Sequence, residues 1–291
     1  MYVFKAAVVG AGTMGGEIAQ VIAAADVPVV LKDVDRRFVD AGLDKARAVT
    51  TGQVRKLVDK GRLAQEQADA QVEEVLARIH GTVSYEDFGD VDFVVEAVPE
   101  RMEVKQAVFA ELDAATPGHA VLASNTSGLS ISEIADATSR PDKVVGFHFF
   151  WPASFMRLIE VVEGDETSPD TLQTAGNFAQ AIRKMPVRCD ECPGFVVNRI
   201  LSSLASEIWR YQDESGVDVE AIDAFIQENG LAPMGPFRLS DMTGLDTTLK
   251  VARDMRDAYG DRFFVHPGMQ DLVEQGNLGQ KTGKGFYEHA G

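Results

Sequence analysis

The 291-residue sequence contains no apolar run that approaches the roughly 18 residues needed for a membrane-spanning helix. Its first residues lead directly into a short apolar segment and lack the basic stretch and apolar core of a secretory signal. These absences favour a protein of the cytoplasm that is not attached to a membrane. With 45% apolar and 25% charged residues, the composition is typical of a globular protein of about two domains.

Cysteine is scarce, and the whole sequence holds only Cys189 and Cys192. Their C-x-x-C spacing is found in redox pairs and in halves of zinc sites. A zinc site needs two further ligands, which no neighbouring histidine pattern supplies, and the pair does not open a helix of the thioredoxin kind. We therefore expect two reduced thiols and no metal site.

Positive charge is also in short supply, because 28 basic residues face 45 acidic ones and the net charge is -17. A protein of this charge is not expected to bind nucleic acid, since phosphate backbones attract basic surfaces. Residues 36–62 are an exception, with more basic than acidic side chains. This segment favours binding of a phosphorylated small ligand, although a solvated helix face explains the same charges equally well.

Short apolar strands alternate with helical patterns up to about residue 188. Strands are expected near residues 3–9, 27–33, 91–97, 120–123, 144–147, 158–162 and 186–188. Helices are expected at 14–25, 36–63, 65–77, 103–115 and 169–183, and then at 195–213, 219–228, 239–259 and 267–274. This order predicts a doubly wound, mainly parallel α/β domain over residues 1–190 and an all-helical domain over residues 191–291.

A glycine-rich turn follows the first expected strand and opens the first expected helix. Gly10, Gly12 and Gly15 fit the G-x-G-x-x-G pattern, in which the glycines allow a tight turn, close approach of a pyrophosphate, and close packing of the helix. Asp33 ends the second strand, where an acid binds the adenosine ribose and repels a 2′-phosphate. The pattern predicts a Rossmann-type domain that binds a nicotinamide dinucleotide, with NAD favoured over NADP.

Polar residues follow three later strands, at the sheet edge where ligands bind in such domains. They are the segments 96–100, 124–127 and 147–150. His148 is a candidate general base for alcohol oxidation, and Glu160 on the next strand is a candidate partner for it. Ser127 and Asn198 are also candidates, although each can equally be a turn, cap or surface residue.

The residues singled out so far fit one known pattern. The sequence resembles the short-chain L-3-hydroxyacyl-CoA dehydrogenases, a family that includes 3-hydroxybutyryl-CoA dehydrogenases. The resemblance covers nearly the whole chain and is carried by motifs at residues 10–15, 94–97, 124–127, 148–150, 158–161, 193–199, 233–237, 244–246 and 281–287. Membership implies NAD-dependent oxidation of a 3-hydroxyacyl thioester to the 3-oxoacyl thioester, or the reverse reaction.

The resemblance also implies roles for matching residues. His148 would remove the hydroxyl proton, Glu160 would pair with it, and Ser127 and Asn198 would align the substrate oxygen. Cofactor contacts are implied for Glu100, Lys105 and Lys281, in addition to the glycine loop. Lys56 would contact CoA, and the helical domain would form a homodimer and close over the site.

The chain departs from the family pattern at a few positions on either side of His148. Trp151 stands where the family usually has asparagine, Ala153 to Met156 also differ, and Gly128 replaces a common serine. The pocket near Trp151 is therefore expected to differ and to contact the substrate. The same chemistry on a thioester of acyl carrier protein, or on a free hydroxy acid, is an alternative, and a non-catalytic NAD-binding protein is a third.

Overall fold

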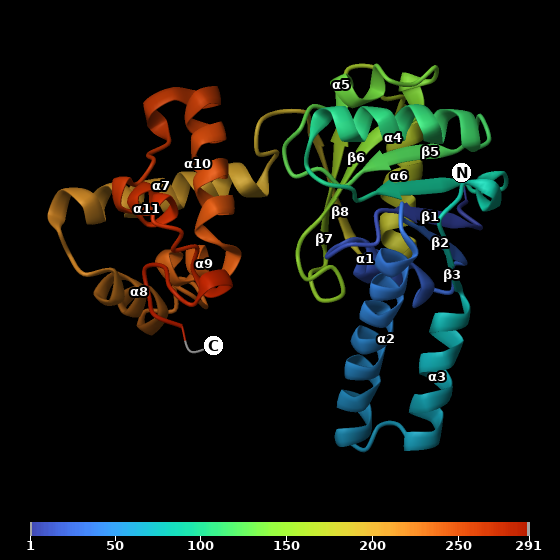
Figure 1. Cartoon of the computed structure of the whole chain (residues 1–291), viewed down its shortest axis with the longest axis horizontal. Coiled ribbons are helices and arrows are strands. Elements are labelled where there is room, and N and C mark those ends of the chain that lie inside the picture. Colours follow the sequence, from blue (N-terminus) through green and yellow to red (C-terminus); the bar gives the residue numbers. More distant parts are fainter. Residues whose placement is uncertain (1, 290–291) are drawn as a thin grey trace. The chain divides into compact units, whose positions relative to one another are not determined.

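The computed structural model describes residues 2–289. The chain divides into two compact units, one up to Phe195 and one from Val196 on. Each is described by itself, and Figure 1 labels the elements of both. Within the described residues, no helix has the length and apolar character needed to cross a membrane.

Unit 1 is built on an eight-stranded sheet with the order β3-β2-β1-β4-β5-β6-β7-β8. All neighbouring strands are parallel except β6 and β7, which are antiparallel. The strands are β1 Ala6–Val9, β2 Val29–Lys32, β3 Ile79–Thr82, β4 Phe93–Glu96, β5 Val121–Ser124, β6 Val144–Phe149, β7 Leu158–Glu163 and β8 Met185–Asp190. The predicted α/β class is confirmed, and the central strands are continuous apolar runs because both faces of the sheet are covered.

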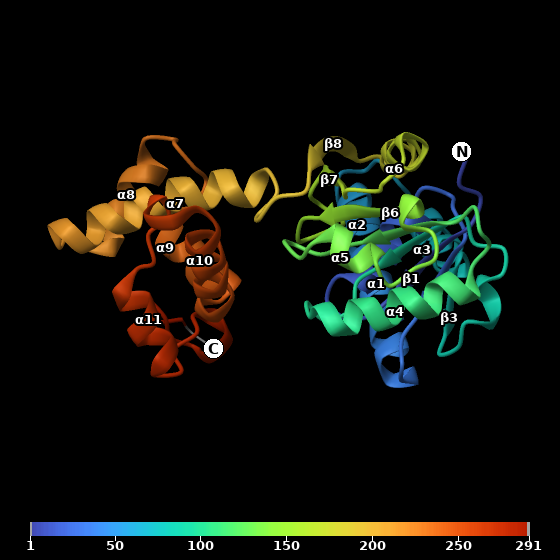
Figure 2. The ribbon, with the colours of Figure 1, turned by 90° about the horizontal axis from the view of Figure 1, so that it is seen from above.

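Helices cover the two faces of this sheet. They are α1 Gly15–Ala23, α2 Arg36–Asp59, α3 Gln65–Ala77, α4 Met102–Ala115, α5 Ile131–Ala135 and α6 Pro169–Ala181, with short 3₁₀ turns η1 Glu86–Phe88 and η2 Pro141–Lys143. One core packs α1 and α6 against the sheet, and a second core packs α4 and α5 against its other face. Figure 2 shows α4 and α6 on opposite sides of the sheet. The long helices α2 and α3 run side by side and extend beyond it (Figure 1).

One strand and one α-helix of unit 1 were not expected from the sequence, in addition to the 3₁₀ turns. The edge strand β3 has the sequence Ile-His-Gly-Thr, in which only Ile79 is buried, so it carries no apolar run. The short helix α5 begins at the cap Ser130, whose side chain accepts from the amide of Glu133. The strand β6 also runs on to Phe149, which places His148 within the strand and not after it.

Unit 2 consists of helices around a small apolar core. They are α7 Val197–Ser215, α8 Val219–Glu228, α9 Pro236–Thr243, α10 Leu245–Tyr259 and α11 Pro267–Glu274, with 3₁₀ turns η3 Gly260–Arg262 and η4 Gln280–Thr282. The prediction of one helix over residues 239–259 is wrong. Gly244 has a φ of 100°, which ends α9, and α10 begins at the next residue.

A buried histidine joins two helices of unit 2. His266 is the N-cap of α11, where its Nδ1 accepts from the amide of Met269 at 3.1 Å. Its Nε2 lies 2.7 Å from Oε1 of Gln212 on α7, and the side chain is only 5% exposed. This arrangement suits the neutral ring, with Nδ1 as acceptor and Nε2–H as donor.

We expect the stability of the protein to depend on this histidine below neutral pH. Burial lowers the pKa of His266 from 6.5, against an opposing effect of Asp213. The unfolded chain therefore binds a proton at a pH where the folded chain does not, so the free energy of unfolding falls as pH drops from about 7 to about 5. His266→Asn keeps an acceptor at the cap and does not titrate, so it should lose less stability over this range in urea unfolding. Equal losses in both proteins would contradict this role.

Candidate active site

The carboxyl ends of β1 and β4 meet where the strand order changes direction, which is where open α/β sheets bind ligands. Gly10 follows β1 with a φ of 97°, and a Cβ there would lie 2.6 Å from the carbonyl oxygen of Ala97 after β4. At Gly15 a Cβ would overlap the Gly10 carbonyl oxygen. Larger residues at these two positions would therefore separate the turn, the helix α1 and the neighbouring strand.

Gly12 lies in different surroundings, because nothing would come within 4 Å of a Cβ there. The open space lies beside the amide groups at the start of α1, which suit an anion. Asp33 supports the loop, since its Oδ2 accepts from the Ala11 amide at 2.7 Å and its Oδ1 from the Val34 amide at 2.6 Å. These residues fit the pyrophosphate and ribose of a dinucleotide.

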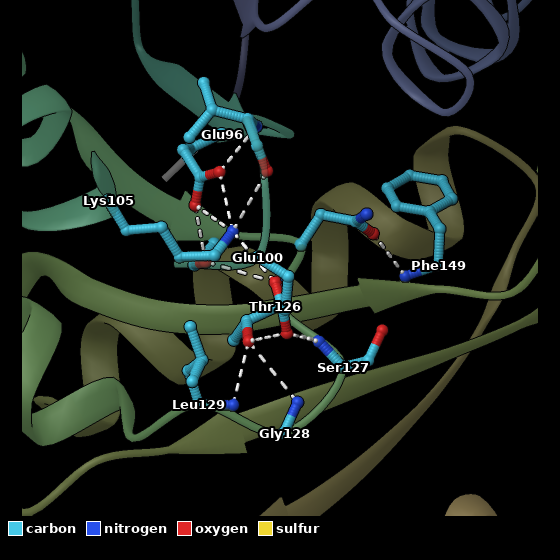
Figure 3. A network of polar contacts seen from close by, with 11 residues as sticks. Glu96, Glu100, Lys105, Thr126, Ser127, Gly128, Leu129 and Phe149 are labelled. Atoms are coloured by element: carbon cyan, nitrogen blue, oxygen red, sulfur yellow. Dashed lines mark hydrogen bonds and ion pairs between the residues drawn. The ribbon is translucent and has the colours of Figure 1, made fainter. Parts of the chain in front are cut away.

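A buried ion pair lies at the end of β4. Glu96 is 0% exposed and Lys105 of α4 is 1% exposed, and the Lys105 Nζ lies 2.8 Å from Glu96 Oε1. Glu96 also accepts from Ser124 Oγ at 2.6 Å and from the Val98 amide at 2.7 Å. Figure 3 shows that the lysine lies between Glu96 and Glu100. A buried carboxylate without such partners would strongly destabilise the fold.

Glu100 carries this network on to the segment that contains Ser127. Its Oε1 accepts from Thr126 Oγ1 at 2.6 Å and from the Ser127 amide at 2.8 Å (Figure 3). Thr126 Oγ1 in turn accepts from the Leu129 amide at 2.9 Å. The backbone of Ser127 is therefore positioned by a chain of contacts that starts at Glu96.

No sequence pattern predicts the contacts of Glu96 or Thr126, although an acid directly after the apolar run 93–95 is a local sign of a polar group at the strand end. The resemblance implies cofactor contacts for Glu100 and Lys105. The structure places Lys105 beneath the sheet edge, where it binds two carboxylates, and its contact with a cofactor stays a prediction.

His148 and Glu160 are brought together by the antiparallel pairing of β6 and β7, in which they are register partners. The His148 Nδ1 lies 2.7 Å from Glu160 Oε2, and both side chains are buried. Because Nδ1 is hydrogen-bonded to the carboxylate, Nε2 is the ring nitrogen that is left to take up a proton. Asn125 Oδ1 accepts from the Phe149 amide at 2.8 Å and so connects the segment after β5 to the end of β6.

Four further candidates, Trp151, Lys56, Asn198 and Lys281, lie on other segments of the chain. Trp151 is 55% exposed, on the connection between β6 and β7. Lys56 is exposed on α2, and the ion pairs among residues 2–289 do not include it. In unit 2, Asn198 is half-buried in the first turn of α7, and Lys281 pairs with Asp246 at 2.7 Å. Their positions relative to His148 stay predictions.

No group of three or more histidine, cysteine, aspartate or glutamate side chains in the described part of the chain could hold a metal ion.

Comparisons with known proteins agree on one family. The model described as "3-hydroxyacyl-CoA dehydrogenase, NAD binding domain" matches residues 5–192, and "3-hydroxyacyl-CoA dehydrogenase, C-terminal domain" matches residues 194–289. The chain is 39% identical over 286 residues to a 3-hydroxybutyryl-CoA dehydrogenase of Clostridioides difficile, with 98% of this chain and 99% of that protein covered. The first model also supports NAD as the cofactor.

Two further relatives show that such a chain occurs both as a separate protein and as part of a longer one. The crystal structure of (S)-3-hydroxybutyryl-CoA dehydrogenase from Ralstonia eutropha has a TM-score of 0.91 and 34% identity, with both chains fully covered. The fatty acid oxidation complex subunit alpha of Pseudomonas savastanoi is 41% identical over 98% of this chain, which spans 38% of that longer protein. By these matches and by its glycine loop and His148–Glu160 pair, the chain belongs to the 3-hydroxyacyl-CoA dehydrogenase family.

Proposed function

We propose that this protein interconverts a 3-hydroxyacyl-CoA and the 3-oxoacyl-CoA, with NAD as the redox cofactor and His148 as the general base. NAD, when bound, would accept the hydride that leaves C3 of the substrate. The glycine loop and Asp33 would hold it at the carboxyl ends of β1 and β2. The observation that carries the proposal is the buried His148–Glu160 contact of 2.7 Å.

In the oxidation direction, the Nε2 of His148 would take the proton of the 3-hydroxyl group. The imidazole then becomes positively charged, and Glu160, bound to Nδ1, would stabilise that charge and hold the ring in place. Glu160 is 0% exposed, so water screens this attraction little. In the reverse direction the same nitrogen would return the proton.

Ser127 and Asn198 would bind the substrate oxygen that reacts. The contacts of Glu100 with Thr126 and with the Ser127 amide support the first assignment, because they fix the backbone that carries the hydroxyl group. The assignments of Asn198 and Lys281 rest on the resemblance, as do direct cofactor contacts for Glu100 and Lys105.

We expect the His148–Glu160 pair to control turnover. His148→Gln should lower kcat by about 10³-fold and Glu160→Gln by about 10²-fold, because the base or its stabilising charge is lost. The affinity for NADH, measured by fluorescence titration, should change little. His119→Gln is a matched control, since His119 forms a similar contact with Asp92 at 3.1 Å on the surface. Near-normal turnover in His148→Gln would refute the proposed mechanism.

CoA is the proposed carrier of the acyl group, with Lys56 as a contact for its phosphates. Several basic side chains of residues 36–62 are already paired, such as Lys45 with Glu17 and Arg47 with Glu73. Lys56 is exposed and is included in no ion pair among the described residues, which leaves its charge available to a phosphate.

Lys56→Glu should therefore raise KM for a CoA thioester about fivefold, or about 1 kcal/mol, without lowering kcat. The pantetheine thioester of the same acyl group, which lacks the nucleotide phosphates, should show no such change. Lys250→Glu makes the same charge change on unit 2 and is the control. A higher kcat/KM with the same acyl group on acyl carrier protein would instead favour the alternative carrier.

We also propose that unit 2 forms a homodimer. Ile200, Leu201 and Leu204 lie on α7 at helical spacing and are 61%, 52% and 60% exposed. An exposed apolar group of this kind is typical of a surface that binds another protein, and a second copy of this chain is the partner that the family implies.

The cytoplasm remains the compartment expected from the sequence.

Leu204→Glu should convert the dimer to a monomer in size-exclusion chromatography with light scattering. Burying a carboxylate between two apolar surfaces costs several times more than the leucine contributes. Phe4→Glu, at an exposed side chain of unit 1, should leave the oligomeric state unchanged. A monomeric parent protein would contradict the dimer without affecting the proposed reaction.

A further inference from the structure

The connection between β6 and β7, here called the 150–157 loop, joins the strand of His148 to the strand of Glu160. Two large aromatic residues of this loop are exposed, Trp151 at 55% and Phe155 at 79%. Ala153 between them is fully buried in the core under the sheet. With so little apolar side chain buried, the loop needs polar anchors to keep one conformation.

The first anchor is Lys184, which precedes β8. Its Nζ donates to the carbonyl oxygen of Ala153 at 2.5 Å and to that of Met156 at 2.7 Å, and the side chain is 8% exposed. Burial lowers the pKa of Lys184, and the neighbouring Arg157 acts in the same direction, against an opposing effect of Glu17. Both of these acceptors are backbone carbonyl groups, so this anchor does not depend on which side chains the loop carries.

The second anchor is Glu17 in the first turn of α1, the helix that follows the glycine loop. Its Oε2 accepts from the amide of Ser154 at 3.3 Å and from the Ser154 hydroxyl at 3.2 Å. Its Oε1 pairs with Nζ of Lys45 on α2 at 3.2 Å. Glu17 is 3% exposed, so its charge is held under the surface by partners on two different segments.

Burying the Glu17 carboxylate costs free energy, which its contacts with Lys45 and Ser154 offset. The carboxylate joins three parts of the molecule that the proposed reaction must bring together: the helix at the dinucleotide loop, the basic helix α2, and the connection that starts directly after His148. Trp151 lies three residues after His148 and three before Ser154. The conformation that Ser154 adopts therefore limits where the indole can stand.

We propose that Glu17 and Ser154 are positioning residues for Trp151, and that through this loop they set the enzyme's selectivity for the acyl group. The inference rests on the proposed function for the identity of the substrate. The acyl substituent on the reacting carbon is the part of the substrate that must lie near His148, and an exposed indole close in sequence offers an apolar surface for it. Selectivity then depends on how firmly the loop is held.

The test uses Glu17→Ala, Glu17→Gln and Ser154→Ala in the full-length protein. Trp151 and Trp209 are the two tryptophans of the chain, and Trp209 is only 4% exposed. In a Trp209→Phe background, quenching of Trp151 fluorescence by acrylamide reports on the loop without any turnover. The second readout is the ratio of kcat/KM for a short and a long 3-oxoacyl-CoA.

We expect Glu17→Ala to raise the quenching constant about twofold, because the loop loses one anchor. It should change the selectivity ratio about tenfold while kcat for the better substrate falls less. Glu17→Gln should be intermediate, since its amide oxygen still accepts from Ser154 but no longer attracts Lys45. Glu73→Gln, which breaks the exposed pair with Arg47, should change neither readout.

Unchanged quenching in a folded Glu17→Ala protein would overturn the proposal, and so would altered quenching with an unchanged selectivity ratio. If Glu17→Ala does not fold, Ser154→Ala decides the same question from the half-exposed side of the contact. If the parent protein turns over no thioester, the proposed function fails, while the quenching experiment still tests whether Glu17 holds the loop.

Discussion

A carboxylate buried in a protein must be paired, and this requirement organises the carboxyl edge of the sheet. The described part of unit 1 contains three buried acidic side chains, Glu17, Glu96 and Glu160. Each is paired with a cation or a histidine, and each contacts a segment that carries a candidate site residue. Glu96 and Lys105 lead through Glu100 to Ser127, Glu160 orients His148, and Glu17 holds the loop of Trp151.

The same requirement operates in unit 2 with a different result. Asp241 is fully buried, accepts from the amides of Phe286 and Tyr287, and pairs with His289. Asp223 accepts from the amide of Arg238 and from the Tyr287 hydroxyl. These contacts fix the last residues described against the helical core, so the buried acids of unit 2 stabilise its fold.

Much of the fold could be predicted from the sequence because local patterns there agree with the tertiary structure. The helices α3, α8 and α11 begin and end at the predicted residues. The start of α11 is marked by Pro267 after the cap His266, and that of α8 by Asp218, a residue type common at N-caps. The strand β3 could not be predicted, because an edge strand with one buried residue has no periodic signal. The break at Gly244 was missed because a glycine within a helical pattern does not by itself reveal a positive φ.

In the candidate site, too, local patterns predicted some features, while others depended on contacts between distant segments. His148 and Glu160 could be proposed as partners because they lie on successive strands, and the structure places them in contact. The burial of Lys105, the relay to Ser127 and the anchoring of Ser154 by Glu17 all depend on contacts between distant segments. No local pattern encodes such contacts, and a single sequence does not show which acids will be covered by which helices.

Because β7 runs antiparallel to β6, the pairing of the catalytic candidates and the sequence of the connection between the two strands can change independently. The register of β6 and β7 fixes the distance between His148 and Glu160, whatever side chains the connection between these strands displays. Substitutions in that connection can therefore accumulate without disturbing the acid–base pair. A duplicated copy of this gene could acquire a new acyl preference through a few changes there and keep its chemistry throughout.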